Sequence, residues 1–359
     1  MDVAGVLRRH LVGCFAMAMV GVCLHPSIVR ADNPRVNILR VRLSPFPGDL
    51  FAVQTNTQPG HLQPFYGASL TWNNKELAMV DSSGTRFFQT VANRLLLEQY
   101  GGLGLSKYLS LALVLPIALF ATGQEPRADL PMDKVDGTYL GDLRVSLKSR
   151  FFDRRKAGGF GAGASIDISL PTATPAGGFN GDRLPTLTAR IILDYLRRGW
   201  GAALNAGFHV RDEAFVDQYP IGNEFWILEA VRFPFLCGRF EGIISLDYQT
   251  ALDGKEFGAK DSSSLVLLTG LKGRAGPVTL QGSVGAGLLS GYGSPAYILN
   301  FGIGYEPMLD SGCRPRSKPD RDLIQRTKER SPLNNADEDG VDDNVGRDVR
   351  KNPEEMLLK

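Results

Sequence analysis

Two consecutive stretches of the chain alternate apolar and polar side chains over their whole length. In residues 139–151 one face is apolar, beginning at Tyr139, and the other face carries charged and small polar side chains. After a turn over residues 153–159, the same alternation resumes over residues 160–170. Because successive side chains of a strand point to opposite faces, we predict two antiparallel strands here. A transmembrane β-barrel shows this pattern, and so does a half-buried hairpin in a soluble sandwich.

The connections between the strand-like runs favour the barrel. About twelve runs follow one another, as in a mid-sized membrane barrel, at residues 65–80, 86–98, 106–119, 139–151, 158–169, 185–196, 199–211, 222–232, 239–250, 263–273, 276–288 and 295–306. The links between them alternate between short and longer, and outer-membrane barrels likewise alternate short periplasmic turns with longer extracellular loops. We therefore predict an all-β fold, a transmembrane antiparallel up-and-down β-barrel of about twelve strands.

The N-terminus is typical of a secretory signal peptide. A basic start at Arg8 and Arg9 precedes an apolar core, and small residues precede a predicted cleavage site after Ala31. No later run reaches the roughly 18 uncharged apolar residues of a membrane-spanning helix. We therefore predict that the chain is exported, cleaved and placed in the outer membrane of a Gram-negative-type cell, in contact with its lipid.

The predicted organisation has four parts. Residues 1–31 form the signal peptide, residues 32–64 a periplasmic N-terminal segment, residues 65–306 the barrel and residues 307–359 a charged periplasmic tail. The tail is poor in aromatic residues and is expected to be mostly disordered. It offers a surface for a periplasmic partner.

Charge and cysteine content narrow the function. The chain has 40 Lys and Arg and 38 Asp and Glu, of which the leader holds three Arg and one Asp, so the mature chain carries no net charge. Nothing in this balance favours a nucleic-acid partner. Cys237 and Cys313 remain after cleavage, both predicted on the periplasmic side, where a disulfide persists. They either pair, which would pin the tail across the barrel mouth, or stay independent thiols.

The inward face of the predicted barrel is the main candidate site. It carries charged residues of both signs and one histidine, namely Asp142, Arg144, Lys148, Arg150, Asp167, Arg190, Asp194, His209, Arg211, Glu241 and Asp247. A water-filled pore lined in this way suits porin-like passage of small polar solutes. Alternatively, opposite charges pair across a narrow lumen and close it, which gives the barrel a structural or assembly role. A soluble periplasmic β-protein that binds a ligand is the third alternative.

The tail contains one candidate metal site. Asn335, Asp337, Asp339 and Asp343 place oxygen ligands around Gly340, as a calcium loop requires. The alternative is a solvated acidic run, and no other cofactor is predicted.

Enzyme chemistry is not indicated. The mature chain has only His61 and His209, and no cluster of His and Cys suits a metal ion. The glycine-rich run 158–163 opens a strand rather than a helix, so small side chains facing a crowded lumen explain it better than a phosphate loop. We predict no catalytic residues and no enzymatic activity.

Three short segments resemble a known family. They are Leu140-Gly-Asp-Leu-Arg144, Leu170-Pro171 followed by Gly181-Asp182, and Ser290-Gly-Tyr-Gly-Ser-Pro295. They resemble the N-terminal barrels of OmpA-family outer-membrane proteins of predatory and soil proteobacteria. In such proteins the barrel is followed by thrombospondin type-3 calcium repeats and a peptidoglycan-binding domain. The resemblance implies a calcium repeat in the tail, whereas the end of the sequence at Lys359 puts anchoring to the cell wall in doubt.

Overall fold

The described part of the chain consists of strands and their connections. The computed structural model describes residues 35–307, except residues 81–85, 126–132, 154–158, 175–177, 198–199, 217–218, 237–238, 253–256 and 260. The predicted signal peptide, the tail with its calcium site, and both Cys237 and Cys313 lie outside the described residues. Within the described ranges, no helix is long and apolar enough to cross a membrane.

The described residues form fifteen strands. They are β1 (Pro64–Val80), β2 (Arg86–Gly104), β3 (Leu109–Thr122), β4 (Asp136–Leu140), β5 (Leu143–Phe152), β6 (Phe160–Leu170), β7 (Thr186–Arg197), β8 (Trp200–Val210), β9 (Ala214–Val216), β10 (Tyr219–Ile221), β11 (Glu224–Phe235), β12 (Phe240–Ala251), β13 (Ser263–Ala275), β14 (Val278–Ser290) and β15 (Tyr297–Tyr305).

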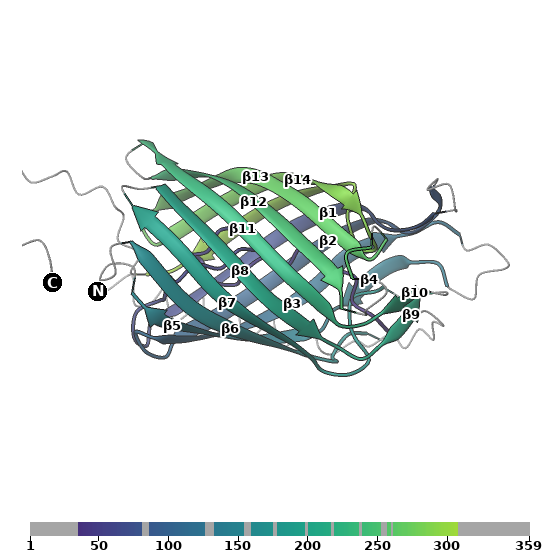
Figure 1. Ribbon diagram of the computed structural model, residues 1–359, viewed down its shortest axis with the longest axis horizontal. Helices are drawn as coiled ribbons and strands as arrows, with labels where there is room; N and C mark the ends of the chain where they lie inside the picture. The colour runs from purple at the N-terminus through teal and green to yellow at the C-terminus, as the bar shows by residue number, and fades with distance from the viewer. Residues whose placement is uncertain are drawn as a thin grey trace, which may run out of the picture. The chain divides into compact units, whose positions relative to one another are not determined.

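The strands close into one antiparallel barrel (Figure 1). The sheet order runs β2-β1-β15-β14-β13-β12-β11-β8-β7-β6-β5-β3, and β2 also pairs with β3, which completes the ring. The short strand β4 precedes β5 in the chain, and both pair with β3, so β4 and β5 together occupy one strand position of the barrel wall. Strands β9 and β10 form a separate hairpin. The predicted all-β barrel of twelve staves is confirmed. Closure stabilises such a sheet in lipid because every strand edge is paired.

Side chains alternate between the two faces of the barrel wall. In β7, Leu187 and Ile191 are 41% and 61% exposed, whereas Thr188 and Arg190 between them are buried. The same alternation runs through β6, β8 and β15. An apolar outward face and a polar inward face are what a barrel in lipid requires.

One irregularity lies between β4 and β5. Pro116 of β3 has no N–H to donate to the adjacent strand. The pairing register of β3 shifts there by one residue between its partner β5 and its partner β4. Gly141 N instead donates to Pro116 O at 2.8 Å. The shift moves Tyr139, which we expected on the outward apolar face, into a buried cluster. That expectation was wrong because a one-residue bulge reverses the faces of the preceding residues.

Aromatic rings gather near both ends of the outward face. Tyr66 stacks on Tyr305 with ring centroids 4.9 Å apart, where β1 begins and β15 ends. Phe208 and Phe225 pack at 5.3 Å near the opposite end. Such belts are expected at the two membrane interfaces.

The two ends of the barrel have different connections. Short turns join β2 to β3, β5 to β6, β7 to β8, β11 to β12 and β13 to β14, and we call this the short-turn end. The longer connections, including the β9–β10 hairpin, gather at the opposite long-loop end (Figure 1). One apolar cluster there contains Ile38 together with Tyr139, Phe179, Val216 and Ile221, and we call this cluster the lid.

Residues 36–58, which we call the strap, lie inside the barrel. Ile38 N donates to Phe179 O at 3.3 Å in the lid, and the strap then runs through the lumen to the short-turn end, where β1 begins at Pro64 (Figure 1). Most of its side chains are buried. From the sequence we predicted that residues 32–64 form a periplasmic segment before the barrel, whereas the structure places residues 36–58 in the lumen.

Candidate functional site

The strap is anchored at the long-loop end by a buried carboxylate, Glu224 at the start of β11. Arg40 Nη1 of the strap lies 2.8 Å from Glu224 Oε2, and the side chain of Arg211 also contacts this carboxylate. Trp226 Nε1 and the Tyr292 hydroxyl donate to it at 3.0 and 2.6 Å. One carboxylate therefore joins the strap to the wall and to two long-loop connections.

Two groups around Glu224 keep their protons because of this environment. Burial raises the pKa of the Tyr292 hydroxyl to about 12, so the phenol remains a donor to Glu224. Burial alone would lower the pKa of Arg211, but the carboxylates of Glu224 and Asp182 outweigh it and raise this pKa above the usual arginine value. Tyr292 and Arg211 therefore both remain hydrogen-bond donors to Glu224 at physiological pH.

The middle of the strap packs against an apolar part of the lumen wall. The strap contributes Val41, Leu43, Leu50, Phe51, Ala52 and Val53. The wall contributes Ala203, Trp226, Leu228, Ala230, Ile243, Val266, Leu268 and Ile298. Burial of these side chains stabilises the strap in the lumen by the hydrophobic effect.

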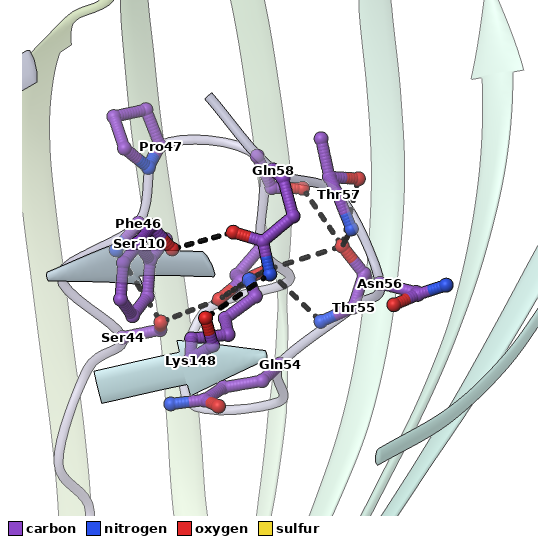
Figure 2. Close-up of polar contacts among 12 residues, drawn as sticks. Ser44, Phe46, Pro47, Gln54, Thr55, Asn56, Thr57, Gln58, Ser110 and Lys148 are labelled. Carbon is purple, nitrogen blue, oxygen red and sulfur yellow. Dashed lines mark hydrogen bonds and ion pairs between the residues drawn. The ribbon is translucent and has the colours of Figure 1, made fainter. Parts of the chain in front are cut away.

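Asp49 is the ionic centre of the strap. Lys148 Nζ of β5 lies 2.7 and 2.9 Å from its two carboxylate oxygens. Thr55 N and Oγ1 donate to Asp49 Oδ1 at 2.9 and 3.0 Å, and Ser44 Oγ donates to Oδ2 at 2.6 Å. Figure 2 shows Lys148 pointing from the wall into this turn of the strap. The carboxylate is thus fully bonded although Asp49 is only 2% exposed.

A second wall lysine reaches the same turn. Lys272 Nζ of β13 donates to the main-chain oxygen of Asp49 at 2.6 Å and also to that of Pro47. The ammonium of Lys148 additionally lies 4.5 Å from the centre of the Phe46 ring, a cation–π contact. Two buried ammonium groups from different strands therefore converge on this strap turn.

Hydrogen bonds to polar side chains of the wall fix the strap near the short-turn end. Gln54 N donates to Asn205 Oδ1 at 2.6 Å, and Asn205 Nδ2 donates to Gln54 O at 2.8 Å. Asn56 N donates to Asp194 Oδ2 at 3.2 Å. Gln58 lies beside Ser110 of β3, as Figure 2 shows. The strap thus contacts side chains of β8, β7 and β3.

The glycine run at the start of β6 makes room for the strap. A Cβ at Gly161 would lie 2.1 Å from Asp194 Oδ1 and 2.8 Å from Asn56 Nδ2. At Gly163 it would lie 3.1 Å from Asn56 Oδ1. Larger side chains here would push against the strap and its anchor.

The structure places all eleven predicted lining residues along the inside of the barrel. Ten are buried, and Arg150 is half-buried near the short-turn rim, 3.7 Å from Asp153. Asp167 and Arg190 form an ion pair with each other. Asp142 instead accepts hydrogen bonds from Ala173 N and Asp182 N at 3.0 and 2.7 Å, which bind a long-loop connection to the wall.

The other predicted residues pair with groups that the sequence pattern did not single out. Arg144 lies 3.5 Å from Glu98, and Glu241 lies 3.3 Å from Arg232. Asp247 Oδ1 accepts from Gln249 at 2.8 Å. Glu98 and Arg232 lie on other strands than their partners, whereas Gln249 lies two residues after Asp247 on β12.

The two histidines have separate structural positions. His209 is fully buried, contacts Thr188 Oγ1 through Nδ1 at 2.7 Å and stacks on Trp226 with centroids 5.3 Å apart. His61 is exposed and contacts Leu105 O at 2.8 Å at the short-turn end. In the described ranges, no group of three or more His, Cys, Asp or Glu side chains is arranged for a metal ion.

The strap was the main element that sequence reasoning missed. Its signal was composition, because Val36, Ile38, Val41, Leu43 and Phe51 are too many apolar side chains for a segment exposed to water. The apolar residues of this segment do not repeat with a period of two or of 3.6 residues, so the pattern predicted neither a strand nor a helix there.

Little space remains between the strap and the wall. A cavity beside Leu39 and Arg42 has a volume of about 20 Å³, and another beside Phe46 and Asp49 has about 10 Å³. A single water needs roughly 10–15 Å³ of such space. With the strap in place, these spaces hold about one water each rather than a solute.

Comparison with known proteins supports the fold. The chain is similar to an outer-membrane channel from Pseudomonas putida F1, with 12% sequence identity, a TM-score of 0.54, and coverage of 71% of this chain and 99% of that one. The NanC porin is a more distant likeness, with 6% identity, a TM-score of 0.44, and coverage of 67% and 98%. No family model and no curated protein matches the sequence. The chain therefore has the fold of an outer-membrane β-barrel, and its resemblance to OmpA-family proteins remains a prediction.

Proposed function

We propose that this protein is a porin-like channel of the outer membrane that passes small solutes when the strap is displaced from the lumen. The observation that carries the proposal is that the hydrogen-bonded ring of strands is complete without the strap. Among the described residues, the strap joins the surrounding protein main chain to main chain only through Ile38 and Phe179. Its movement therefore breaks side-chain contacts and leaves the wall closed against lipid.

The wall behind the strap suits an aqueous path. Thr71 Oγ1 donates to Asn300 Oδ1 at 2.6 Å, and Asn300 Nδ2 donates to Ser283 Oγ at 3.1 Å, which forms a neutral polar band across β1, β15 and β14. The hydroxyls of Ser69 and Thr279 on the same side have no hydrogen-bond partner among the described residues. Such groups match a polar lining better than a core that is permanently packed.

A disulfide lock tests the proposal. The side-chain amide of Asn205 makes two hydrogen bonds to the main chain of Gln54, so these two positions are in direct contact between the wall and the strap. The pair Gln54→Cys and Asn205→Cys is made in a protein that also carries Cys237→Ser and Cys313→Ser. Conductance in planar bilayers is recorded before and after addition of a reductant. We expect discrete steps only in the reduced protein, and the Gln54→Cys single variant serves as the control that ignores the reductant.

The same experiment separates the closed-barrel alternative, which the tightly filled lumen favours. Equal conductance in the oxidised and reduced protein would show that the strap does not control the path. Silence in both states, with heat-dependent gel migration showing a folded barrel, would support a closed barrel with a structural or assembly role. The migration assay also checks that the cysteine variants fold.

The parts of the chain outside the described residues complete the proposal. We expect the leader to be removed after Ala31 and the tail from residue 307 onward to lie in the periplasm, because both termini of outer-membrane barrels lie on the side of the short turns. Binding of calcium at residues 335–343 and of a periplasmic partner by the tail remain predictions.

A further inference from the structure

Two lysines of the wall depend on the strap for their bonding partners. Lys148 and Lys272 are 0% and 1% exposed. Lys148 pairs with Asp49, and among the described residues no other carboxylate lies within 4 Å of it. Lys272 donates to main-chain oxygens of the strap and likewise has no carboxylate within that distance in the described ranges. Displacement of the strap takes these hydrogen-bond acceptors away from both lysines and opens their side chains to the lumen, where an anion can take the place of Asp49.

An apolar surface lies beside these lysines. The strap covers it with Leu50, Phe51 and Val53, the residues that directly follow Asp49 in the chain. They pack in one cluster with wall residues of β8, β11, β12, β13 and β15. In this part of the lumen the strap therefore presents one carboxylate followed by an apolar body.

The long-loop half of the lumen has a different charge. There the strap contributes Arg40 rather than an acid, and the wall contributes the carboxylate of Glu224. The strap thus offers a cation to a wall carboxylate in the long-loop half and a carboxylate to a wall lysine at Lys148. We expect an anion to compete with the strap at the lysine pair.

We propose that Lys148 and Lys272 form a binding site for amphiphilic carboxylates, organic acids with a single carboxylate and an apolar body, which occupy the place of Asp49 and the apolar side chains after it. The inference rests on the proposed displacement of the strap. The two ammonium groups bind the carboxylate, and the apolar wall covers the body by the hydrophobic effect. Such an acid competes with the strap and, by mass action, favours its displacement.

Accessibility of the strap reports this competition. Val53→Cys, in a protein that also carries Cys237→Ser and Cys313→Ser, places one thiol in a strap position that is 0% exposed. The rate of its modification by a membrane-impermeant maleimide is measured in proteoliposomes with octanoate, octylammonium or acetate. At octanoate concentrations about ten times its dissociation constant, we expect the rate to rise about tenfold. Octylammonium has the same body with the opposite charge, acetate has the same charge without the body, and both should leave the rate unchanged.

Lysine variants locate the site. Combined Lys148→Gln and Lys272→Gln should abolish the response to octanoate, whereas combined Lys148→Arg and Lys272→Arg should retain it. Heat-dependent gel migration selects the variants that fold, and the arginine variant keeps the test valid if the glutamine variant does not fold.

Each other outcome overturns the inference. An equal response to octylammonium would assign the effect to the apolar body or the membrane, and an equal response to acetate would reduce the site to a simple anion site. If the strap can be displaced, Asp49→Asn should expose the thiol of Val53→Cys even when no ligand is present. Rapid modification in that variant with no response to octanoate in the parent would reject the binding site alone. Slow modification in both would reject strap displacement and therefore the proposed function as well.

Discussion

Asp49→Asn is the most informative single change because it keeps the size of the side chain and removes one charge of a buried pair. Lys148 is 0% exposed and its carboxylate partner 1% exposed. Removing one member of such a pair costs about 3–5 kcal/mol, since the other charge stays buried without compensation. Each 1.4 kcal/mol corresponds to a factor of ten in a population, so the ratio of displaced to bound strap should rise about 100- to 1,000-fold or more.

Bilayer recording measures this change directly. We expect Asp49→Asn to increase the fraction of time spent in conducting states, with the same step size as the reduced disulfide-lock protein. The matched control is the double variant Asp49→Asn and Lys148→Met, which removes both charges of the pair and keeps an amide oxygen that accepts from Thr55. Because such replacements are often neutral, the double variant should close again.

The comparison of single and double variants isolates the ion pair from the packing around it. If Asp49→Asn folds, as judged by heat-dependent migration, and stays as silent as the parent, then the Asp49–Lys148 pair does not hold the lumen closed. If the double variant conducts as strongly as Asp49→Asn, the effect comes from packing of the strap turn rather than from charge.

Three further changes test other parts of the structure. Glu224→Gln should weaken the lid by about 3–5 kcal/mol, since Arg40 loses its carboxylate, and hydrogen exchange of residues 36–39 should accelerate while exchange in the barrel strands stays constant. Glu229 is exposed on the outward face of β11 between Leu204 and Leu246, so Glu229→Leu should stabilise the barrel in lipid vesicles by about 1–2 kcal/mol in urea unfolding, and a loss of stability would contradict a lipid-facing position. Peptide mass spectra of the unreduced protein should show Cys237 joined to Cys313 if the tail is pinned at the barrel mouth, and two free thiols would contradict it.

The sequence by itself determined the wall of this barrel. Lipid on one side and a polar interior on the other impose a period of two on every strand, so the runs from residues 65 to 306 predicted the staves and their exposed faces. The alternation of short and longer links further distinguished a membrane barrel from a sandwich. The predicted face was wrong at Tyr139 because Pro116 in the neighbouring strand cannot donate a hydrogen bond between the strands. The period of two does not reveal this effect, because the two residues are distant in sequence.

Only the tertiary structure decided what fills the barrel. The sequence indicated that Lys148 faces the lumen, but its partner Asp49 lies 99 residues earlier, in a segment without periodicity. Glu224 likewise gathers Arg40, Arg211 and Tyr292 from three different parts of the chain. The alternation of apolar and polar residues indicates which face of a strand meets lipid and which meets the lumen, because each side chain must suit its own surroundings. The choice of partner across the lumen depends on which strands closure places opposite one another, and on how the strap folds into the space that they enclose.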